Sequence, residues 1–149
     1  MDDTLDKGQV DSALFEFLQC VYLFEKRESA MFGVGWDEIY LLQLLKHEPG
    51  LCVSDIASRL RIEKFVASRM LTRLSEKNLV KRDVSALDKR IVKLYITKEG
   101  ENKISEIEEY NYNTVVLQTK QIPKEDILFL LNSLEKLPVL LNLQDKIDL

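Results

Sequence analysis

The sequence predicts a mainly α-helical fold with one small β-hairpin. Over most of the 149 residues, apolar side chains recur at steps of three and four, the spacing of helices that bury one face. Two runs, 80–85 and 91–97, differ because they are rich in β-branched residues, nearly alternate in polarity and are joined by a short polar loop. The length suits a single domain over residues 1–149 with one hydrophobic interior.

Three helices are expected before residue 61. The first spans about residues 10–32, where bulky apolar side chains occupy a broad face, and a Gly-Val-Gly sequence at 33–35 ends it. The second starts near Asp37, and the Glu-Pro-Gly sequence at 48–50 ends it. A short third helix follows over 53–60, with Ile56, Ala57 and Leu60 facing inward.

A fourth helix, from about residue 64 to 77, has two chemically different faces. Its apolar face carries Val66, Ala67, Met70, Leu71 and Leu74. Its other face is basic and hydroxylic and carries Lys64, Ser68, Arg69, Thr72 and Arg73. Asn78 follows directly, and asparagine tolerates the left-handed conformation that ends many helices. The hairpin should therefore begin just after this residue.

Two further helices are expected after the hairpin. Thr97 can cap the start of the first one, whose first turn carries two glutamates that complement the helix dipole. Pro123 suits the first turn of the second, and leucines keep helical spacing there as far as Pro138. The sequence thus predicts helices on both sides of the short helices and the hairpin.

Charge is segregated along the chain. The formal net charge is −4, which by itself argues against a nucleic-acid partner. Residues 54–98, however, hold 12 basic and 5 acidic side chains, a net charge of +7, and the rest holds 9 basic and 20 acidic, a net charge of −11. A basic middle between acidic helical arms is typical of a DNA-reading module. The alternative is that these charges only solvate the surface.

Several other classes of protein are not expected. The longest apolar run, 127–131, is far too short to span a bilayer, and the acidic start lacks the order of a signal peptide, so a cytoplasmic protein without membrane contact is predicted. Cys20 and Cys52 form no C-x-x-C pair and His47 is the only histidine, so we expect neither a metal ion nor a cofactor. The sequence shows no nucleophile with a base, no paired catalytic carboxylates and no phosphate loop, which argues against an enzyme.

The order of elements and three segments resemble the multiple-antibiotic-resistance regulator (MarR) family of winged helix-turn-helix transcription factors. The segments are SDIASRL, VASRMLTRLSEKNLVKR and DKRIVKLYITKEG. The family's Asp-x-Arg wing tip is matched by Asp88 and Arg90, and its Leu-Thr-x-x-Gly helix entry by Ile96, Thr97 and Gly100. The resemblance implies a winged helix-turn-helix core at 36–98, flanked by dimerisation helices at 10–32 and 99–149. Arg61 and Asn78 depart from the family, which favours glycine at both places.

The chemistry of these residues predicts how DNA is read. A helix fits the major groove, where arginine can donate two hydrogen bonds to guanine and short hydroxyl side chains can reach base edges. The candidate base readers are Ser68, Arg69, Thr72 and Arg73. Arg90 at the wing tip is expected in the narrow minor groove, with Asp88 orienting its guanidinium. The candidate phosphate contacts are Lys64, Lys81, Arg82 and Lys89. For each of them the alternative is an ordinary surface charge.

The terminal helices carry more leucine than a small domain can cover. The residues expected to bury themselves in a dimer are Leu14, Leu18, Leu130, Leu134 and Leu137. A two-fold homodimer would place two recognition helices about one DNA turn apart on a palindromic operator. The alternative is a monomer whose terminal helices fold onto its own core.

A ligand pocket is implied near the junction of the first two helices. Its candidate residues are Tyr22, Met31, Trp36 and Tyr40, which would bind a small aromatic effector. The alternative is that these residues are plain core. Cys20 lies among bulky apolar residues, so we expect a buried, inert thiol rather than the oxidant sensor that some MarR relatives carry on their first helix.

The function predicted from sequence is therefore sequence-specific binding of double-stranded DNA by a transcriptional regulator. The resemblance favours a ligand-responsive repressor that binds a palindromic operator as a homodimer. The alternative is a winged-helix module that makes protein contacts without sequence-specific DNA binding.

Overall fold

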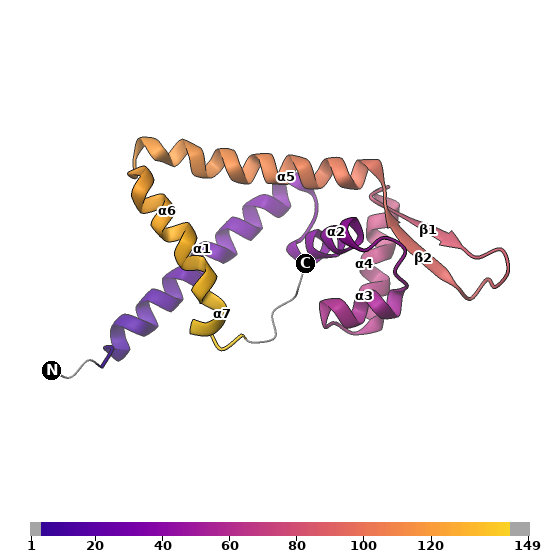
Figure 1. The fold of residues 1–149 in the computed structure, drawn as a ribbon, viewed down its shortest axis with the longest axis horizontal. Coiled ribbons are helices and arrows are strands. Elements are labelled where there is room, and N and C mark those ends of the chain that lie inside the picture. The colour runs from indigo at the N-terminus through magenta and orange to yellow at the C-terminus, as the bar shows by residue number, and fades with distance from the viewer. Residues whose placement is uncertain (1–3, 144–149) are drawn as a thin grey trace. The chain divides into compact units, whose positions relative to one another are not determined.

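The computed structural model describes residues 4–143, which form helices and one two-stranded sheet (Figure 1). The order of elements is α1 (Lys7–Phe32), α2 (Trp36–His47), α3 (Val53–Leu60), α4 (Lys64–Glu76), β1 (Val80–Val84), β2 (Val92–Ile96), α5 (Lys98–Leu117), η1 (Gln118–Lys120), α6 (Lys124–Ser133), η2 (Leu134–Lys136) and α7 (Leu137–Leu140). The mainly helical fold with one hairpin is thus confirmed. The chain divides into two compact units, 1–39 and 40–149, so the boundary falls in the first turn of α2.

The first unit consists largely of α1. Asp6 caps its start, because a carboxylate oxygen accepts a hydrogen bond from the backbone N–H of Gln9 at 2.9 Å. Gly33 ends it with φ at 68°, a left-handed conformation that glycine adopts without steric cost, and its N–H bonds to the Ser29 carbonyl oxygen at 2.9 Å. The predicted end near residue 32 is confirmed, whereas the helix begins at Lys7, three residues before the predicted start, because the Asp6 cap was not recognised.

The second unit contains a compact hydrophobic core. Side chains from α2, α3, α4, β2 and α5 are at most 1% exposed there, among them Leu41, Leu45, Ile56, Met70, Leu71, Leu74, Leu94 and Ile104. The inward positions expected on α3 and α4 are confirmed, except that Val66 is only half-buried. This core fixes the orientation of α4, because one of its two faces is fully occupied.

The hairpin is antiparallel, with Val80 opposite Ile96 and Val84 opposite Val92. A third segment joins it at Leu51, because the Leu94 N–H bonds to the Leu51 carbonyl oxygen at 2.9 Å. The segment that ends α2 is thereby tied to β2. These backbone bonds attach the hairpin to the helical core.

The start of α5 is locked against the end of α4. Asn78 has φ at 59°, the left-handed conformation expected of it, and its carbonyl oxygen accepts a hydrogen bond from Thr97 Oγ1 at 2.7 Å. The same Thr97 hydroxyl accepts the Gly100 N–H at 3.0 Å and so caps α5 as predicted. A Cβ at Gly100 would meet the Leu79 carbonyl oxygen and Ile96 Cγ1, so only glycine fits this close approach.

The C-terminal region differs from the prediction of one continuous helix as far as Pro138. Helix α6 ends at Ser133, and the 3-10 turn η2 and the short helix α7 follow. Pro138 has no N–H to donate to the residue four positions earlier, so an α-helix cannot continue through it with full hydrogen bonding. It instead occupies the first turn of α7, where that N–H is not needed. Similarly, Pro123 lies at the N-cap of α6 rather than inside its first turn.

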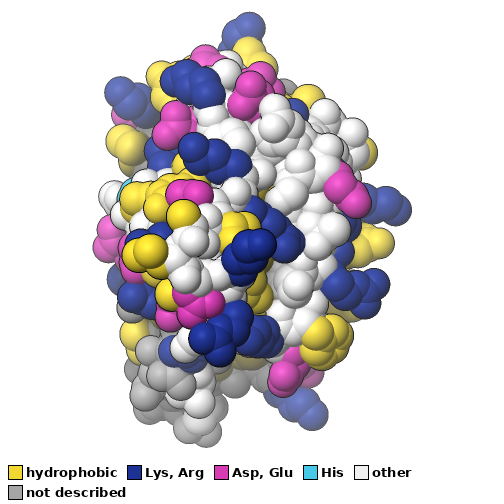
Figure 2. Space-filling view, turned by 90° about the vertical axis from the view of Figure 1, so that its right-hand side faces the viewer, with side chains coloured by type: hydrophobic (Ala, Val, Ile, Leu, Met, Phe, Trp, Pro, Cys, Tyr) yellow, Lys and Arg dark blue, Asp and Glu magenta, His cyan; other side chains and the backbone are white. Residues whose placement is uncertain are grey.

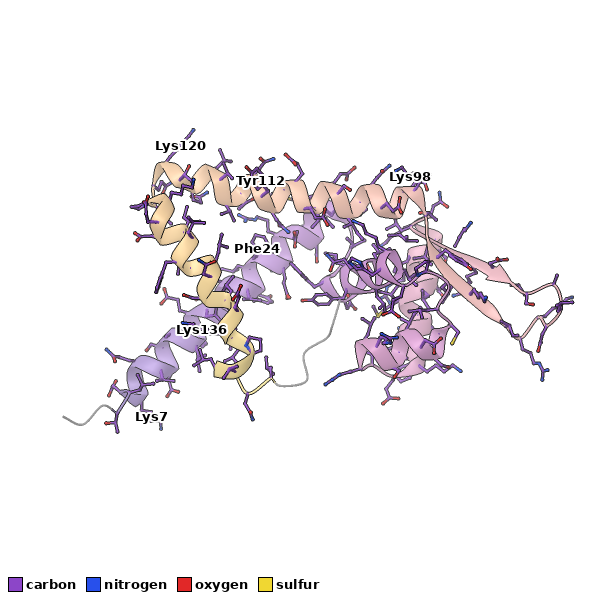
Figure 3. All side chains as sticks on the ribbon, viewed as in Figure 1. Lys7, Phe24, Lys98, Tyr112, Lys120 and Lys136 are labelled. Atoms are coloured by element: carbon purple, nitrogen blue, oxygen red, sulfur yellow. The ribbon has the colours of Figure 1, made fainter. Side chains whose placement is uncertain are left out.

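Side chains project from α5 along its whole length, from Lys98 through Tyr112 to the η1 residue Lys120 (Figure 3). Ile104 and Ile107, in the first half, are buried, whereas Tyr112 and Leu117 further along are exposed. None of the helices in the described part of the chain is long and apolar enough to cross a membrane.

Candidate nucleic-acid interface

The outer face of α4 presents the residues that the sequence placed there. Lys64, Arg69, Thr72 and Arg73 are exposed and Ser68 is half-buried. The opposite face, with Ala67, Met70, Leu71 and Leu74, is buried in the core. Among residues 4–143, Lys64 and Arg69 have no ion-pair partner that would neutralise them. The helix therefore offers cationic side chains on a face whose direction is fixed by the core behind it.

Thr72 is tied to the hairpin through Arg82. Its hydroxyl donates to the Ser68 carbonyl oxygen at 3.0 Å and accepts a hydrogen bond from Arg82 Nη2 at 3.3 Å. The two residues are ten positions apart in the sequence, and only their proximity in the fold reveals the link. Because a hydroxyl has one proton to donate, Thr72 can offer a further partner only an acceptor lone pair.

Lys81 and Arg82 lie on opposite faces of the hairpin, because successive side chains of a strand alternate. Arg82 faces α4, whereas the ammonium of Lys81 lies 5.7 Å from the ring centroid of its cross-strand neighbour Tyr95. The far face also forms a shallow depression lined by Asp83, Ser85, Ile91, Lys93 and Tyr95. Lys81 and Arg82 were both predicted to contact phosphates, but in the structure only Arg82 adjoins the α4 face.

The loop between the strands is internally hydrogen-bonded. Ser85 N–H bonds to the Ile91 carbonyl oxygen at 2.9 Å, and Ile91 N–H bonds to the Asp88 carbonyl oxygen at 3.0 Å. Ser85 Oγ accepts the N–H groups of Leu87 and Asp88, both at 3.3 Å. The wing loop, residues 85–91, therefore has a defined turn structure that can hold its tip in one orientation.

Asp88 clamps Arg90 at this tip. One carboxylate oxygen of Asp88 accepts from the Arg90 backbone N–H at 3.0 Å and from Nε at 3.1 Å, and the other accepts from Nη2 at 3.2 Å. The hydrogen bonds from the Arg90 side chain, followed by the one from its backbone, hold the pKa of Asp88 below its ordinary value. The Arg90 side chain is nevertheless 92% exposed, so the guanidinium is oriented but still open to a partner.

Some cations near α4 and the hairpin are neutralised by acidic partners and others are not. Arg59 of α3 pairs with Glu48 at 2.7 Å, and Lys98 pairs with Glu101 at 3.7 Å. Lys89 has no such partner among the residues that the structure describes. Figure 2, which views the molecule from the side on which the hairpin lies in Figure 1, shows Lys and Arg side chains standing out on this surface. Lys64, Arg69 and Lys89 are thus exposed cations that can contact a phosphate backbone.

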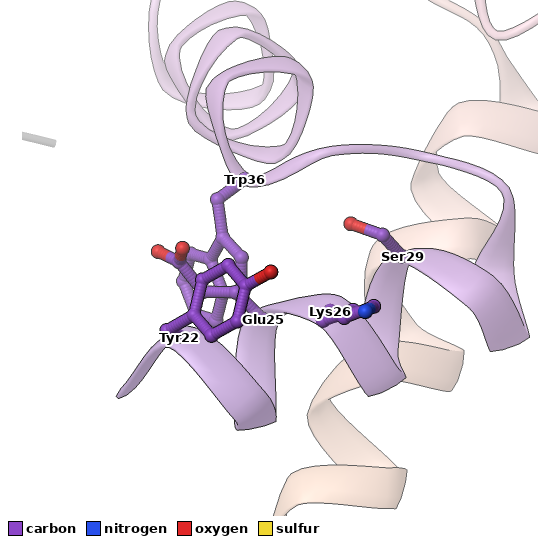
Figure 4. A pocket seen from close by; sticks show the side chains of 5 residues that line it. All are labelled: Tyr22, Glu25, Lys26, Ser29 and Trp36. Carbon is purple, nitrogen blue, oxygen red and sulfur yellow. The ribbon is translucent and has the colours of Figure 1, made fainter. Parts of the chain in front are cut away.

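The predicted effector pocket is only partly reproduced. Within the first unit, Tyr22 and Trp36 line a cavity of 320 Å³ together with Glu25, Lys26 and Ser29 (Figure 4). Met31 is exposed and does not line this cavity, and Tyr40 belongs to the second unit. The three polar lining residues were missed, although their spacing of three, four and seven from Tyr22 places them on the same stripe of α1.

Cys20 is exposed, so the expectation of a buried thiol is wrong. The expectation came from its apolar neighbours in the sequence, Leu18, Val21 and Leu23, but these are exposed too. Neighbours in a helical sequence point in different directions, and α1 carries more apolar surface than its own unit covers.

The residues predicted to form a dimer interface lie at or near the surface of the single chain. Leu18, Leu130 and Leu134 are exposed, and Leu14 and Leu137 are half-buried. Phe129, Val139 and Leu140 add further exposed apolar surface beside the C-terminal leucines. Apolar surface of this kind marks a region available for association.

Comparisons with known proteins agree with this geometry. The MarR family model matches residues 36–92. The HTH-type transcriptional repressor MdtR of Bacillus subtilis (strain 168) is 33% identical over an alignment of 91 positions, which covers 57% of this chain and 59% of that repressor, less than two thirds of its length. The crystal structure of the YusO protein from Bacillus subtilis is 25% identical, with a TM-score of 0.69 over 89% of this chain and 97% of that one.

A structure with DNA has the same fold. Streptococcus pneumoniae FabT in complex with DNA is 20% identical and has a TM-score of 0.67 over 92% of this chain and 98% of that one. The likeness to FabT extends over nearly all of both chains, including the helices outside the matched 36–92 segment. The family model, the curated relative and the solved structures thus agree on a MarR-like segment over residues 36–92, which contains α4 and most of the hairpin.

Proposed function

We propose that this protein is a transcriptional regulator that binds double-stranded DNA at specific sequences. The observation that carries the proposal is the Asp88 clamp, which holds an almost fully exposed arginine at the tip of an ordered hairpin. An oriented guanidinium suits the narrow minor groove, whose negative potential attracts it. The match of the MarR family model to residues 36–92, and the fold shared with FabT, whose structure is a complex with DNA, support DNA binding.

Helix α4 is the proposed reader of the major groove. Arg69 and Arg73 can donate paired hydrogen bonds to guanine, and Ser68 can reach a base edge or a phosphate. Thr72 has a second task, because it links α4 to Arg82 and so holds the hairpin against the reading helix. Lys64, Arg82 and Lys89 contact phosphates, which adds affinity and salt dependence without sequence information.

The proposed active form is a homodimer on a palindromic operator. The exposed leucines of α1 and of the C-terminal region supply apolar surface that a two-fold partner would bury. Two copies of α4, one from each subunit, would then read two half-sites about one DNA turn apart. The repressor name of MdtR favours repression as the outcome.

The Tyr22–Trp36 cavity is the proposed effector site. Its volume of 320 Å³ lies in the range that accommodates a small organic ligand, and its two aromatic side chains suit an aromatic one. Glu25, Lys26 and Ser29 supply the polar groups that would orient it. Such a ligand regulates DNA binding only if it has different affinities for the DNA-bound and the free conformations.

The test is a selection from a random double-stranded DNA library, followed by fluorescence-anisotropy titration of the selected site at two salt concentrations. Wild-type protein should enrich a palindrome and lose affinity as salt rises. Arg73→Ala should weaken binding and also relax the preference among site variants, because a base-edge contact carries sequence information. Failure to enrich any site, with weak binding that ignores salt, would favour a winged helix that makes only protein contacts.

A further inference from the structure

Phe65 is a large aromatic residue at the second position of α4, on its outer face. It is 62% exposed, although a phenylalanine ring gains free energy when it leaves water. Arg69 and Thr72 lie four and seven residues further on, so they share its stripe of the helix. The core-facing side of α4 is opposite. The ring therefore lies at the N-terminal end of the face that we propose enters the major groove.

The Phe65 ring contributes little to packing within the chain. Among residues 4–143 it makes no aromatic or cation–π contact, and the α4 side chains that fill the core are Ala67, Met70, Leu71 and Leu74. The apolar stripe of α4 is complete without it. A partner outside the chain would account for an aromatic side chain at this place better than packing within the chain does.

The surroundings of Phe65 restrict the nature of that partner. Lys64 precedes it and Arg69 follows it one turn later, and both are exposed cations without an ion-pair partner in the described part of the chain. A partner on this face must therefore be an anion overall and yet present an apolar group at the level of the ring. DNA meets both conditions in its major groove, because the 5-methyl group of thymine is the apolar feature on the base edges there.

We propose that Phe65 is a specificity-determining residue that contacts the 5-methyl group of a thymine in each half-site. The inference rests on the proposed function, because it requires α4 to lie in the major groove. The residues at the N-terminal end of a recognition helix are those that reach base edges, and Phe65 lies in the first turn. Phe65 and Arg69 are four residues apart, about 6 Å along the helix axis. That distance corresponds to about two base-pair steps of roughly 3.4 Å, so the thymine should lie within about two base pairs of the guanine that Arg69 contacts.

The experiment uses the site selected from the random library and replaces its thymines one position at a time by deoxyuridine. This exchange removes only the methyl group and keeps the base pair. Wild-type protein should bind about fourfold more weakly for each contacted methyl removed, which is the effect of burying one methylene group expressed as a binding ratio. The other thymine positions should show no effect.

Phe65→Ala isolates the contribution of the ring. The variant should bind the thymine site and the deoxyuridine site with equal affinity, and Phe65→Leu should retain part of the difference. Both variants should match the wild type in circular dichroism and thermal unfolding, because the ring is exposed. Leu87→Ala is the matched control, since Leu87 is a fully exposed apolar residue of the wing, which faces the minor groove where no methyl group lies. Its ratio of thymine to deoxyuridine affinity should equal that of the wild type.

Two results would overturn the role of Phe65. One is a wild-type protein that binds a selected site but is indifferent to every methyl group. The other is a methyl effect that persists unchanged in Phe65→Ala. Both differ from failure of the proposed function, in which wild-type protein would select no site at all.

Discussion

The α4–wing region and the terminal helices differ in how far their leucine side chains are buried. In the first, leucines such as Leu71, Leu74 and Leu94 are fully buried within one unit of the chain. In the second, leucines of similar spacing in the sequence, such as Leu18 and Leu134, remain exposed. The α4–wing region therefore covers its apolar side chains within its own unit, whereas the terminal helices leave apolar surface open, which the proposed dimer would bury.

The largest effect is expected when charge is placed on the exposed apolar surface of the C-terminal helices. Leu130→Glu combined with Leu134→Glu should abolish the proposed dimer at micromolar concentration, because burying two uncompensated carboxylates costs several kcal/mol. Sedimentation velocity of the variant should show a monomer and that of the wild type a dimer. Val84→Glu is the control, since Val84 is about equally exposed but lies on the hairpin. A wild-type monomer, or a double variant that remains dimeric, would contradict the assignment of this surface.

Shortening a buried leucine of the α4–wing region should destabilise the fold. Leu71→Ala should lower the free energy of unfolding by about 2–5 kcal/mol, because it removes buried methyl groups and leaves a cavity. Urea denaturation followed by circular dichroism measures the change. Leu87→Ala, the same substitution at a fully exposed position, should change stability by no more than about 0.5 kcal/mol. Equal effects at the two positions would refute the burial pattern.

The wing is tested by removing its exposed cation. Arg90→Ala should weaken binding to the selected site by about 1–3 kcal/mol and reduce the salt slope by about one phosphate contact. Unfolding temperature and sedimentation should be unchanged, because the side chain is exposed and outside the core. Asp88→Ala should act in the same direction but more weakly, since it leaves the cation and removes only its clamp. Full-strength binding by a folded Arg90→Ala protein would exclude the wing from DNA contact.

The smallest expected effect is the pH dependence of the clamp. The Arg90 hydrogen bonds lower the pKa of Asp88 in the folded chain, so their stabilising effect is fully present above the ordinary pKa of 3.8 and is lost as pH falls through the lowered value. The Arg90 Nε–H resonance in NMR spectra should therefore shift across that acidic range. It should not shift there in Asp88→Asn, whose amide does not titrate. An identical shift in both proteins would place its cause elsewhere.

Features that depend on near neighbours in the chain were predictable from sequence. The helix periods, the two strands, the left-handed Asn78 and the Thr97 cap all follow from interactions within a few residues. Arg61 shows the limit of a residue-type rule: the structure gives it φ of 56°, so an arginine adopts the left-handed turn for which the family favours glycine.

The positions of the candidate site residues could be predicted from the sequence, but most of the contacts between them could not. The polar and basic side chains that the sequence assigned to the outer face of α4 lie there in the structure, and Asp88 bonds to Arg90. Phe65 also lies on this outer face, but it was not among the predicted site residues, because aromatic residues on helices usually belong to the core. The bond between Thr72 and Arg82 and the separation of Lys81 from α4 required the register of the hairpin and its position against the helix.

By itself the sequence determined the order of helices and strands, which face of α4 is apolar, and that the basic residues gather in the middle of the chain. Only the tertiary structure decided that Cys20 is exposed, that α6 ends before Leu134, and which residues line the cavity with Tyr22. The reason is physical. Periodicity and caps act along the backbone over one or two turns, whereas burial and side-chain contacts depend on how segments distant in the sequence pack together.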